Sequence, residues 1–328
     1  MSRSRPFIAM FLNLAGDNPE ISGRREAFLQ GVGVIPGLTV AACFGAGDFD
    51  EYGDKAQALR DLRVDGAGPD LYFATCWPSL RALLAVAGDT PIVFAGLCDL
   101  SDDPEDNPTY EDNVYGFISF GKNLCEEWVR LLKVVSPEVE RAAVLFDTDT
   151  SRPDMQLVYN EIRDYAGRVQ IDVTTGINSG SHALRADLEA FANQARTPAG
   201  LIVAASVLAA NNRQIIIDAA KDLELPVVYP NRLYTFSGGL ISKGTYIQGL
   251  YRSAGQYARK LIHGERPSPQ IDITQTGLNP APHKRAVFET IINAQAANDI
   301  SLPLTPDVLM KIKPDLIIDS VSPDSVIT

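Results

Sequence analysis

The sequence is poor in the side chains that most often carry catalysis or bind metals. Only three histidines occur in 328 residues, which leaves few candidates for imidazole catalysis. The cysteines have no C-x-x-C spacing and no neighbouring histidine, and this argues against a metal or redox centre; they are Cys43, Cys76, Cys98 and Cys125. We interpret the cysteines as small buried apolar groups, and we expect neither a metal nor a cofactor.

Basic charge and long apolar runs are also scarce. The formal net charge is −12, from 29 lysines and arginines against 41 aspartates and glutamates. Such a chain repels nucleic-acid phosphate and anionic lipid, so no nucleic-acid partner is expected. No apolar run approaches the ~20 residues that span a bilayer, and direct membrane insertion is not expected.

The common nucleotide and esterase motifs are missing as well. The sequence contains no G-x-x-x-x-G-K-[ST] stretch and no G-x-S-x-G elbow. The run "GVGVIPG" from Gly31 has the wrong spacing for a dinucleotide fingerprint and follows a predicted helix. The acidic stretch "DLSDDPEDNPTYEDN" lacks the central glycine and closing glutamate of an EF-hand loop. We therefore interpret it as a solvated surface loop.

The N-terminal stretch "MSRSRPFIAMFLNLAG" has a basic start followed by apolar residues, which is the outline of an export signal. The apolar part is short and lacks a small-x-small cleavage site. We interpret "PFIAMFLN" as the first buried strand. We expect either that an export signal has been removed from this chain or that the protein stays in the cytoplasm.

What the sequence does contain is a regular alternation of apolar runs and amphipathic segments. Its 45% hydrophobic and 21% charged residues are ordinary for a globular protein, and its length exceeds the usual single-core limit of roughly 250 to 300 residues. Ten short runs are predicted to be buried strands: "FIAMFLN", "TVAACFG", "LYFATC", "PIVFAGL", "NVYGFIS", "RAAVLFD", "QIDVTTG", "GLIVAAS", "PVVYP" and "GGLISKG".

Alternation of strands and helices predicts parallel sheets covered by helices. The pattern occurs twice, with four strands up to Gly96 and a second series that begins near Val144. The sequence therefore predicts two Rossmann-like α/β lobes.

Polar and aromatic side chains gather at the ends of the predicted strands, where open parallel sheets bind ligands. These candidates are Asn13, Thr75, Cys76, Trp77, Ser79, Asp99, Asp147, Ser206, Tyr229 and Arg232. Trp77 either stacks on a flat ligand or covers the core. Arg232 is either a surface charge or a fork for a carboxylate or phosphate, and its place just past a buried strand favours the fork.

The C-terminal half resembles a known family. The stretches "VVYPNRLYTFSGGLISKGTYIQGLYRSAGQYARKLIHGERPS" and "FETIINAQAANDISLPLTPDVLMK" are similar to ABC-transporter substrate-binding proteins, of the type whose characterised members bind aromatic or other hydrophobic amino acids. The motif positions are Tyr229, Pro230, Arg232, Gly238, Gly239, Leu240, Ser242, Gly244, Tyr251, Arg252, Gly264, Pro267, Asn293, Ala297, Pro303 and Leu309. Upstream, "REAFLQGVG", "TPIVFAG" and "NVYGFIS" extend the resemblance over nearly the whole chain.

Three departures from the family pattern bear on the ligand. The chain has Cys76-Trp77-Pro78 where relatives usually have Gly-Thr-Pro or Gly-Ser-Pro, and Ser242-Lys243-Gly244 where Ser-Tyr-Gly is usual. Ser206 replaces an aspartate that many relatives carry. These changes add Ser242 and Lys243 to the candidate ligand-binding residues, and they put the usual carboxylate grip in doubt.

The resemblance implies a type I periplasmic-binding-protein-like fold with a three-segment hinge. We expect residues 1–118 plus 245–280 to form the first lobe and 119–244 plus 281–328 the second. The implied function is that of a solute-binding component of an ABC importer, with no catalysis, which closes on a small-molecule ligand and then meets permease subunits. The implied location is periplasmic.

Two other functions stay open at this point. One is a cytosolic small-molecule sensor on the same scaffold, and the other is an enzyme that pairs Asp99 with Asp147 across the cleft. For the binding protein, we predict a small, partly planar and anionic ligand, with Trp77 stacking on its flat part and Arg232 holding its charge. The alternative is that Lys243 forms a structural ion pair with Asp99 or Asp147 that has no role in binding. Cys76 and Cys98 could lie within the ~7 Å reach of a disulfide, but we predict free thiols.

Overall fold

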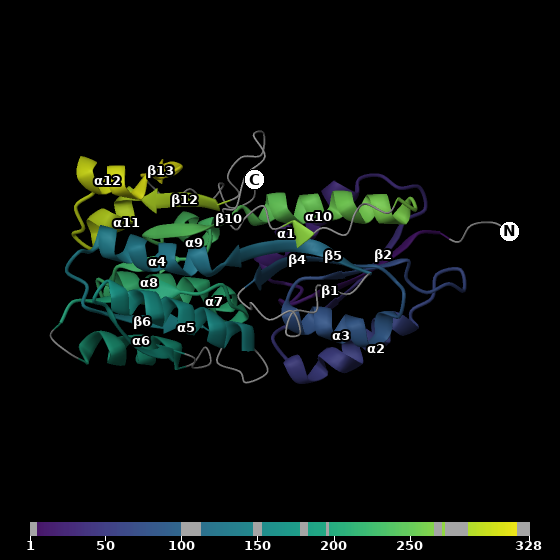
Figure 1. The fold of residues 1–328 in the computed structure, drawn as a ribbon, viewed down its shortest axis with the longest axis horizontal. Coiled ribbons are helices and arrows are strands. Elements are labelled where there is room, and N and C mark those ends of the chain that lie inside the picture. The colour runs from purple at the N-terminus through teal and green to yellow at the C-terminus, as the bar shows by residue number, and fades with distance from the viewer. Residues whose placement is uncertain are drawn as a thin grey trace. The chain divides into compact units, whose positions relative to one another are not determined.

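A computed structural model of the chain describes residues 5–99, 113–146, 153–177, 183–194, 197–265, 271–272 and 288–319. The chain divides into two units (Figure 1), with residues 1–120 and 247–275 in unit 1 and residues 121–246 and 276–328 in unit 2. The chain therefore passes between the units three times. The boundaries fall at 120 instead of the expected 118, at 247 instead of 245 and at 275 instead of 280.

Unit 1 is built on a sheet with the strand order β11-β5-β4-β3-β1-β2. Its strands are β1 (Phe7–Leu12), β2 (Thr39–Phe44), β3 (Leu71–Ala74), β4 (Ile92–Asp99), β5 (Val114–Gly121) and β11 (Ile271–Asp272). The pairings of β1 with β2 and β3, of β3 with β4, and of β5 with β11 are parallel. Every residue of β1 is buried, as expected for a strand covered on both faces.

Helices cover both faces of this sheet (Figure 1). They are α1 (Pro19–Val32), α2 (Tyr52–Asp61), α3 (Trp77–Ala87) and α10 (Ile247–Ile262), and a short 3₁₀ helix η1 (Phe49–Glu51) precedes α2. The ring of Phe73 on β3 contacts Phe28 of α1 and Tyr251 of α10, at centroid distances of 3.9 and 5.7 Å. The neighbouring residue Ala74 belongs instead to the core shared with α2 and α3, because side chains alternate across a strand.

Helices α1 and α10 approach each other through two glycines. A Cβ atom at Gly31 would lie 2.0 Å from the carbonyl oxygen of Arg252, and one at Gly255 would lie 2.0 Å from the carbonyl oxygen of Phe28. Only glycine permits backbones this close. The first helix of the chain is therefore packed directly against a helix that follows the second crossing.

Unit 2 contains a seven-stranded sheet with the order β13-β12-β10-β9-β8-β6-β7. Its strands are β6 (Arg141–Leu145), β7 (Asp172–Ile177), β8 (Ala199–Val203), β9 (Val227–Tyr229), β10 (Ile241–Thr245), β12 (Phe288–Asn293) and β13 (Leu316–Ile318). Strand β12 runs antiparallel to β10, whereas the other pairings are parallel.

The helices of unit 2 are α4 (Lys122–Val135), α5 (Pro153–Arg168), α6 (Leu184–Asn193), α7 (Val207–Asn211), α8 (Arg213–Asp222), α9 (Arg232–Phe236), α11 (Ala294–Asp299) and α12 (Pro306–Ile312). One core packs α6 and α8 against β6, β8 and β9. On α4, the fully buried Trp128 donates its indole N–H to the carbonyl oxygen of Lys243 at 2.7 Å, which ties that helix to β10.

Each of the ten predicted strand runs overlaps a strand of the structure, so the α/β architecture with two sheets is confirmed. Strands β11, β12 and β13 were not predicted. Within the described ranges, no helix is long and apolar enough to cross a membrane.

Candidate functional site

The carboxyl ends of β1 and β3 are joined by two polar side chains. The backbone N–H of Asn13 donates to Thr75 Oγ1 at 2.9 Å, and Thr75 Oγ1 lies 2.9 Å from Asn13 Oδ1, to which it donates. Asn13 is 8% exposed and Thr75 is 2% exposed. Each group therefore satisfies the other in a buried position, and the two predicted residues do lie together at the edge of the unit 1 sheet.

The turn that follows β3 caps the N-terminus of α3 with hydrogen bonds between its own residues. Cys76 is the N-cap residue, and its Sγ atom accepts from the backbone N–H of Ser79 at 3.4 Å. Ser79 Oγ in turn accepts from the backbone N–H groups of Thr75 and Cys76 at 3.2 and 3.1 Å. Pro78 has no N–H to offer. The hydroxyl of Ser79, a candidate ligand-binding group, makes these hydrogen bonds within the turn and donates to the carbonyl oxygen of Cys76 at 2.9 Å.

Trp77 begins α3 and is half-buried. It packs against the core formed by α2, α3 and their face of the sheet. This contact is the core-covering role that the sequence left open, and the partial exposure leaves room for the stacking role as well. Cys76 is a free thiol in the structure, whereas the side chain of Cys98 lies outside the described part of the chain.

The two candidate carboxylates are only partly placed. Asp99 is the last residue of β4, so its backbone lies on the same carboxyl edge as Thr75. Its side chain, like the whole of Asp147, lies outside the described residues. The predicted pairing of these carboxylates, with each other or with Lys243, therefore stays a prediction.

A buried ionic group in the same unit was missed by sequence reasoning. Glu20, in the first turn of α1, accepts a hydrogen bond from Arg24 Nη2, and the two side chains are 2% and 14% exposed. The Arg24 guanidinium carbon lies 5.9 Å from the ring centroid of Tyr251, and burial raises the pKa of Tyr251 to about 12. The spacing of Glu20 and Arg24, four residues apart on a helix, was the available signal.

In unit 2, Ser206 and Tyr229 serve the fold. Ser206 caps α7 by accepting from the backbone N–H of Ala209 at 3.1 Å. Tyr229 is 1% exposed, its ring stacks on Tyr234 at 5.1 Å, and burial raises its pKa. Tyr229, a candidate from the end of a predicted strand, thus has its ring in the core of unit 2. A cavity beside it, between α8 and α11, measures about 20 Å³, room for about one water molecule.

Arg232 already has a carboxylate partner in the structure. It is the first residue of α9, and its Nε atom donates to Glu289 Oε1 at 2.6 Å while Nη2 binds Oε2. Its guanidinium carbon lies 4.8 Å from the ring centroid of Tyr246 and 5.4 Å from that of Phe236. The fork predicted from the sequence is present, but it holds an internal glutamate.

Lys243 lies in the middle of β10 and turns its ammonium to Thr290, with Nζ 2.7 Å from Oγ1. Burial lowers the pKa of Lys243, and the charges of Glu127 and Asp315 oppose this shift. Glu127 and Asp315 are the carboxylates that the described part of the chain shows to act on it, and its pairing with Asp99 or Asp147 stays a prediction. The adjacent Ser242 is 1% exposed, and its Oγ atom has no hydrogen-bond partner among the described residues.

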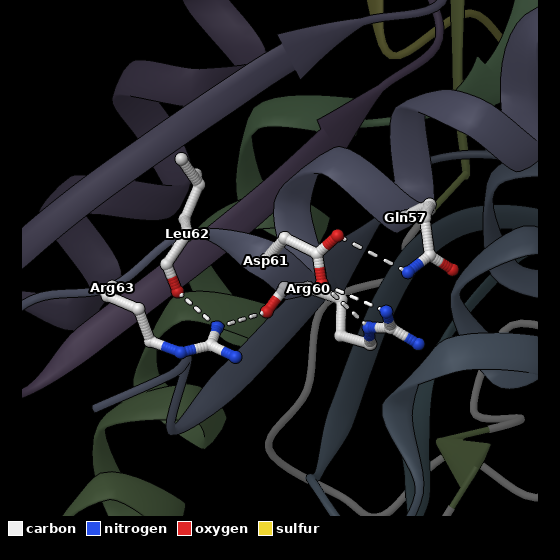
Figure 2. Close-up of polar contacts among 5 residues, drawn as sticks. All are labelled: Gln57, Arg60, Asp61, Leu62 and Arg63. Carbon is white, nitrogen blue, oxygen red and sulfur yellow. Dashed lines mark hydrogen bonds and ion pairs between the residues drawn. The ribbon is translucent and has the colours of Figure 1, made fainter. Parts of the chain in front are cut away.

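A further polar cluster lies at the C-terminal end of α2 (Figure 2). Arg60 donates to Asp61 through Nε and Nη2 at 3.0 and 2.9 Å, and Arg63 donates to the carbonyl oxygens of Arg60 and Leu62. The hydrogen bonds from Arg60 and Gln57 hold the pKa of Asp61 below its usual range. The cluster is exposed, and its Arg63 side chain supplies hydrogen bonds to carbonyl oxygens at the end of a helix. We therefore do not assign it a ligand.

At the carboxyl edge of the unit 1 sheet, five candidates lie together: Asn13, Thr75, Cys76, Trp77 and Ser79. The candidates of unit 2 are distributed over its core, α9 and β10. Among the described residues, no group of three or more His, Cys, Asp or Glu side chains could hold a metal ion. The geometry at the unit 1 edge suits hydrogen bonding and stacking.

Two α/β units with mainly parallel sheets, traversed three times by one chain, are the architecture of type I periplasmic binding proteins. The sequence model of the ABC transporter substrate binding protein family matches residues 48–312, and the chain belongs to this family. A search of curated proteins finds no match.

Several solved structures share the fold at low sequence identity. An ABC domain from Streptococcus pneumonia in complex with L-Trp is 15% identical, with a TM-score of 0.76, over 96% of this chain and 100% of that one. A conserved domain protein from Vibrio cholerae is 17% identical, with a TM-score of 0.76, over 95% and 99%. A 5-methylthioribose transporter solute binding protein from Thermotoga lettingae, in complex with 5-methylthioribose, is 14% identical, with a TM-score of 0.56, over 80% and 82%.

Proposed function

We propose that the protein is the solute-binding component of an ABC-type importer. The observation that carries the proposal is the polar carboxyl edge of the unit 1 sheet, where Asn13, Thr75 and the half-buried Trp77 follow adjacent parallel strands. Ligands of open α/β sheets bind at such edges. Family membership supports the same function, since the family consists of ABC transporter substrate-binding proteins.

The ligand that this edge favours is a small molecule with a flat part that stacks on Trp77. Amino acids are the first class to test, because a neighbour in fold was solved with L-Trp. The pairing of Arg232 with Glu289 removes the main argument for an anionic group held by Arg232. The proposed ligand is therefore small, partly planar and amino-acid-like, and residues other than Arg232 bind any charged group that it carries.

The proposed mechanism is hinge closure. Ligand contacts supplied by both units favour a closed state, which permease subunits then recognise. The three passages of the chain between the units supply the hinge segments that such a motion requires. We propose a location outside the cytoplasmic membrane, as is typical of the family.

Mass spectrometry of the small molecule retained by the purified protein identifies the ligand. Calorimetry with that molecule then tests the site: Trp77→Ala is expected to weaken binding by about 1 to 3 kcal/mol through lost stacking and burial. Trp77→Phe, which keeps an aromatic ring, is the matched control and should lose less. Equal affinity of the wild type and Trp77→Ala would show that the ligand binds away from Trp77.

The enzyme alternative depends on Asp99 and Asp147, whose side chains lie outside the described part of the chain. Incubation of the protein with the identified ligand, followed by mass spectrometry, separates the two functions. A binding protein returns the ligand unchanged. Conversion of the ligand would favour the enzyme.

A further inference from the structure

Arg232 contacts the segment of unit 2 that precedes the second chain crossing and a strand that follows the third. Strand β10 leads to Tyr246, the last residue before the chain passes to unit 1. Strand β12 is the first described element of unit 2 after the chain has returned. Arg232 contacts the ring of Tyr246, directly after the end of β10, and the carboxylate of Glu289 in β12.

The register of the two strands explains how one side chain reaches both. The strands are antiparallel, with Thr245 opposite Phe288 and Gly244 opposite Glu289. The end of β10 and the start of β12 therefore lie side by side. Arg232 stands next to this pair of ends because the turn after β9 approaches Gly244 closely: a Cβ atom there would lie 1.8 Å from the carbonyl oxygen of Pro230.

The pair has the features of a fixed contact. The side chains of Arg232 and Glu289 are 24% and 15% exposed, and both carboxylate oxygens of Glu289 are engaged. Two-point binding of a carboxylate by arginine is directional as well as charge-assisted. The rings of Phe236 and Tyr246 hold the guanidinium further. Partial burial separates this pair from the exposed ion pairs that contribute little to stability.

We propose that Arg232 is a hinge-positioning residue, which fastens the outgoing end of β10 to the incoming end of β12. The hinge role rests on the proposed function, since only a closing protein needs fixed pivot segments. The guanidinium is committed to Glu289 and is not a ligand contact. Its loss should therefore loosen these two strand ends selectively, while the remainder of unit 2 keeps its protection.

Hydrogen–deuterium exchange of the ligand-free protein tests the proposal without any knowledge of the ligand. In Glu289→Gln, which keeps the side-chain shape, amides of 241–246 and 288–293 are expected to exchange about tenfold faster or more. The charge-swapped variant Arg232→Glu with Glu289→Arg should restore part of the protection. Circular dichroism verifies that each variant is folded.

The matched control is Arg185→Gln. It breaks another ion pair of unit 2, in which Arg185 Nη2 lies 2.6 Å from Asp222 Oδ2 with side chains 46% and 55% exposed. This variant should leave exchange at 241–246 and 288–293 unchanged. Unchanged exchange in Glu289→Gln, or acceleration spread evenly over unit 2, would overturn the proposal. A failure of the protein to bind any solute would contradict the proposed function but not the fastening of the strand ends.

Discussion

Thr75→Val is the substitution that tests the polar edge of unit 1 most directly. Valine keeps the branched shape of threonine but replaces the hydroxyl with a methyl group. The backbone N–H of Asn13, which donates to Thr75 Oγ1 at 2.9 Å, is then left without its acceptor in a buried position. An unsatisfied buried donor costs about 1 to 3 kcal/mol, and the lost hydrogen bond to Asn13 Oδ1 adds about 0.5 to 1.5 kcal/mol. We expect the free energy of unfolding to fall by about 2 to 4 kcal/mol in total.

Urea denaturation, followed by far-UV circular dichroism, measures this change. Thr75→Ser is the matched control, because it keeps the hydroxyl and removes one methyl group, at a cost of about 1 kcal/mol. Valine should therefore destabilise the protein clearly more than serine. Equal losses in the two variants, or a gain with valine, would refute the view that the hydroxyl of Thr75 ties β1 to β3.

Two further predictions concern β10. Burial places the pKa of Lys243 below the 10.5 of the unfolded chain, so the unfolded state binds more protons as the pH approaches 10.5. The stability of the wild type relative to Lys243→Met should therefore rise from pH 7 to pH 10. Urea denaturation measures this difference in stability, and a flat or falling difference would contradict the prediction. Gly244→Ala places a Cβ atom 1.8 Å from the Pro230 carbonyl oxygen and should lower the free energy of unfolding by about 3 kcal/mol or more. The control Gly53→Ala in α2, where a Cβ atom has nothing within 4 Å, should be neutral or stabilising. Thermal melts that rank the two variants in the opposite order would show that the turn after β9 can move to accommodate the methyl group.

The parallel part of the fold was predictable from sequence because buried strands leave continuous apolar runs. All six residues of β1 are buried, and "FIAMFL" is apolar throughout. The strands that were missed do not share this property. In β13, two of three residues are exposed, and β12 begins with the half-buried Phe288 and Glu289. Apolar runs therefore identify strands with several consecutive apolar residues, and they miss strands that are short or begin with partly exposed residues, such as β13 and β12.

The candidate site was predictable only in part, for a related reason. The rule that polar groups follow parallel strands located Asn13 and Thr75 at neighbouring strand ends. It could not assign partners. Glu289 is 57 residues from Arg232 in sequence and sits on an antiparallel strand that was not predicted, so the arginine looked free. The run "VVYP" carried the apolar signal of a core residue at Tyr229, and that signal was the correct one.

The glycine contact between α1 and α10 has a consequence for synthesis of the chain. The face of α1 that meets Gly255 has no partner until residues 247–262 have left the ribosome. Residues 33–246 emerge before that point, since α1 ends at Val32, and 126 of them, residues 121–246, belong to unit 2. Domains whose parts are contiguous in sequence fold as soon as they emerge. In unit 1, by contrast, the face of α1 that packs against α10 stays uncovered during most of translation. We expect its nascent N-terminal segment to depend on chaperones until the late helix arrives.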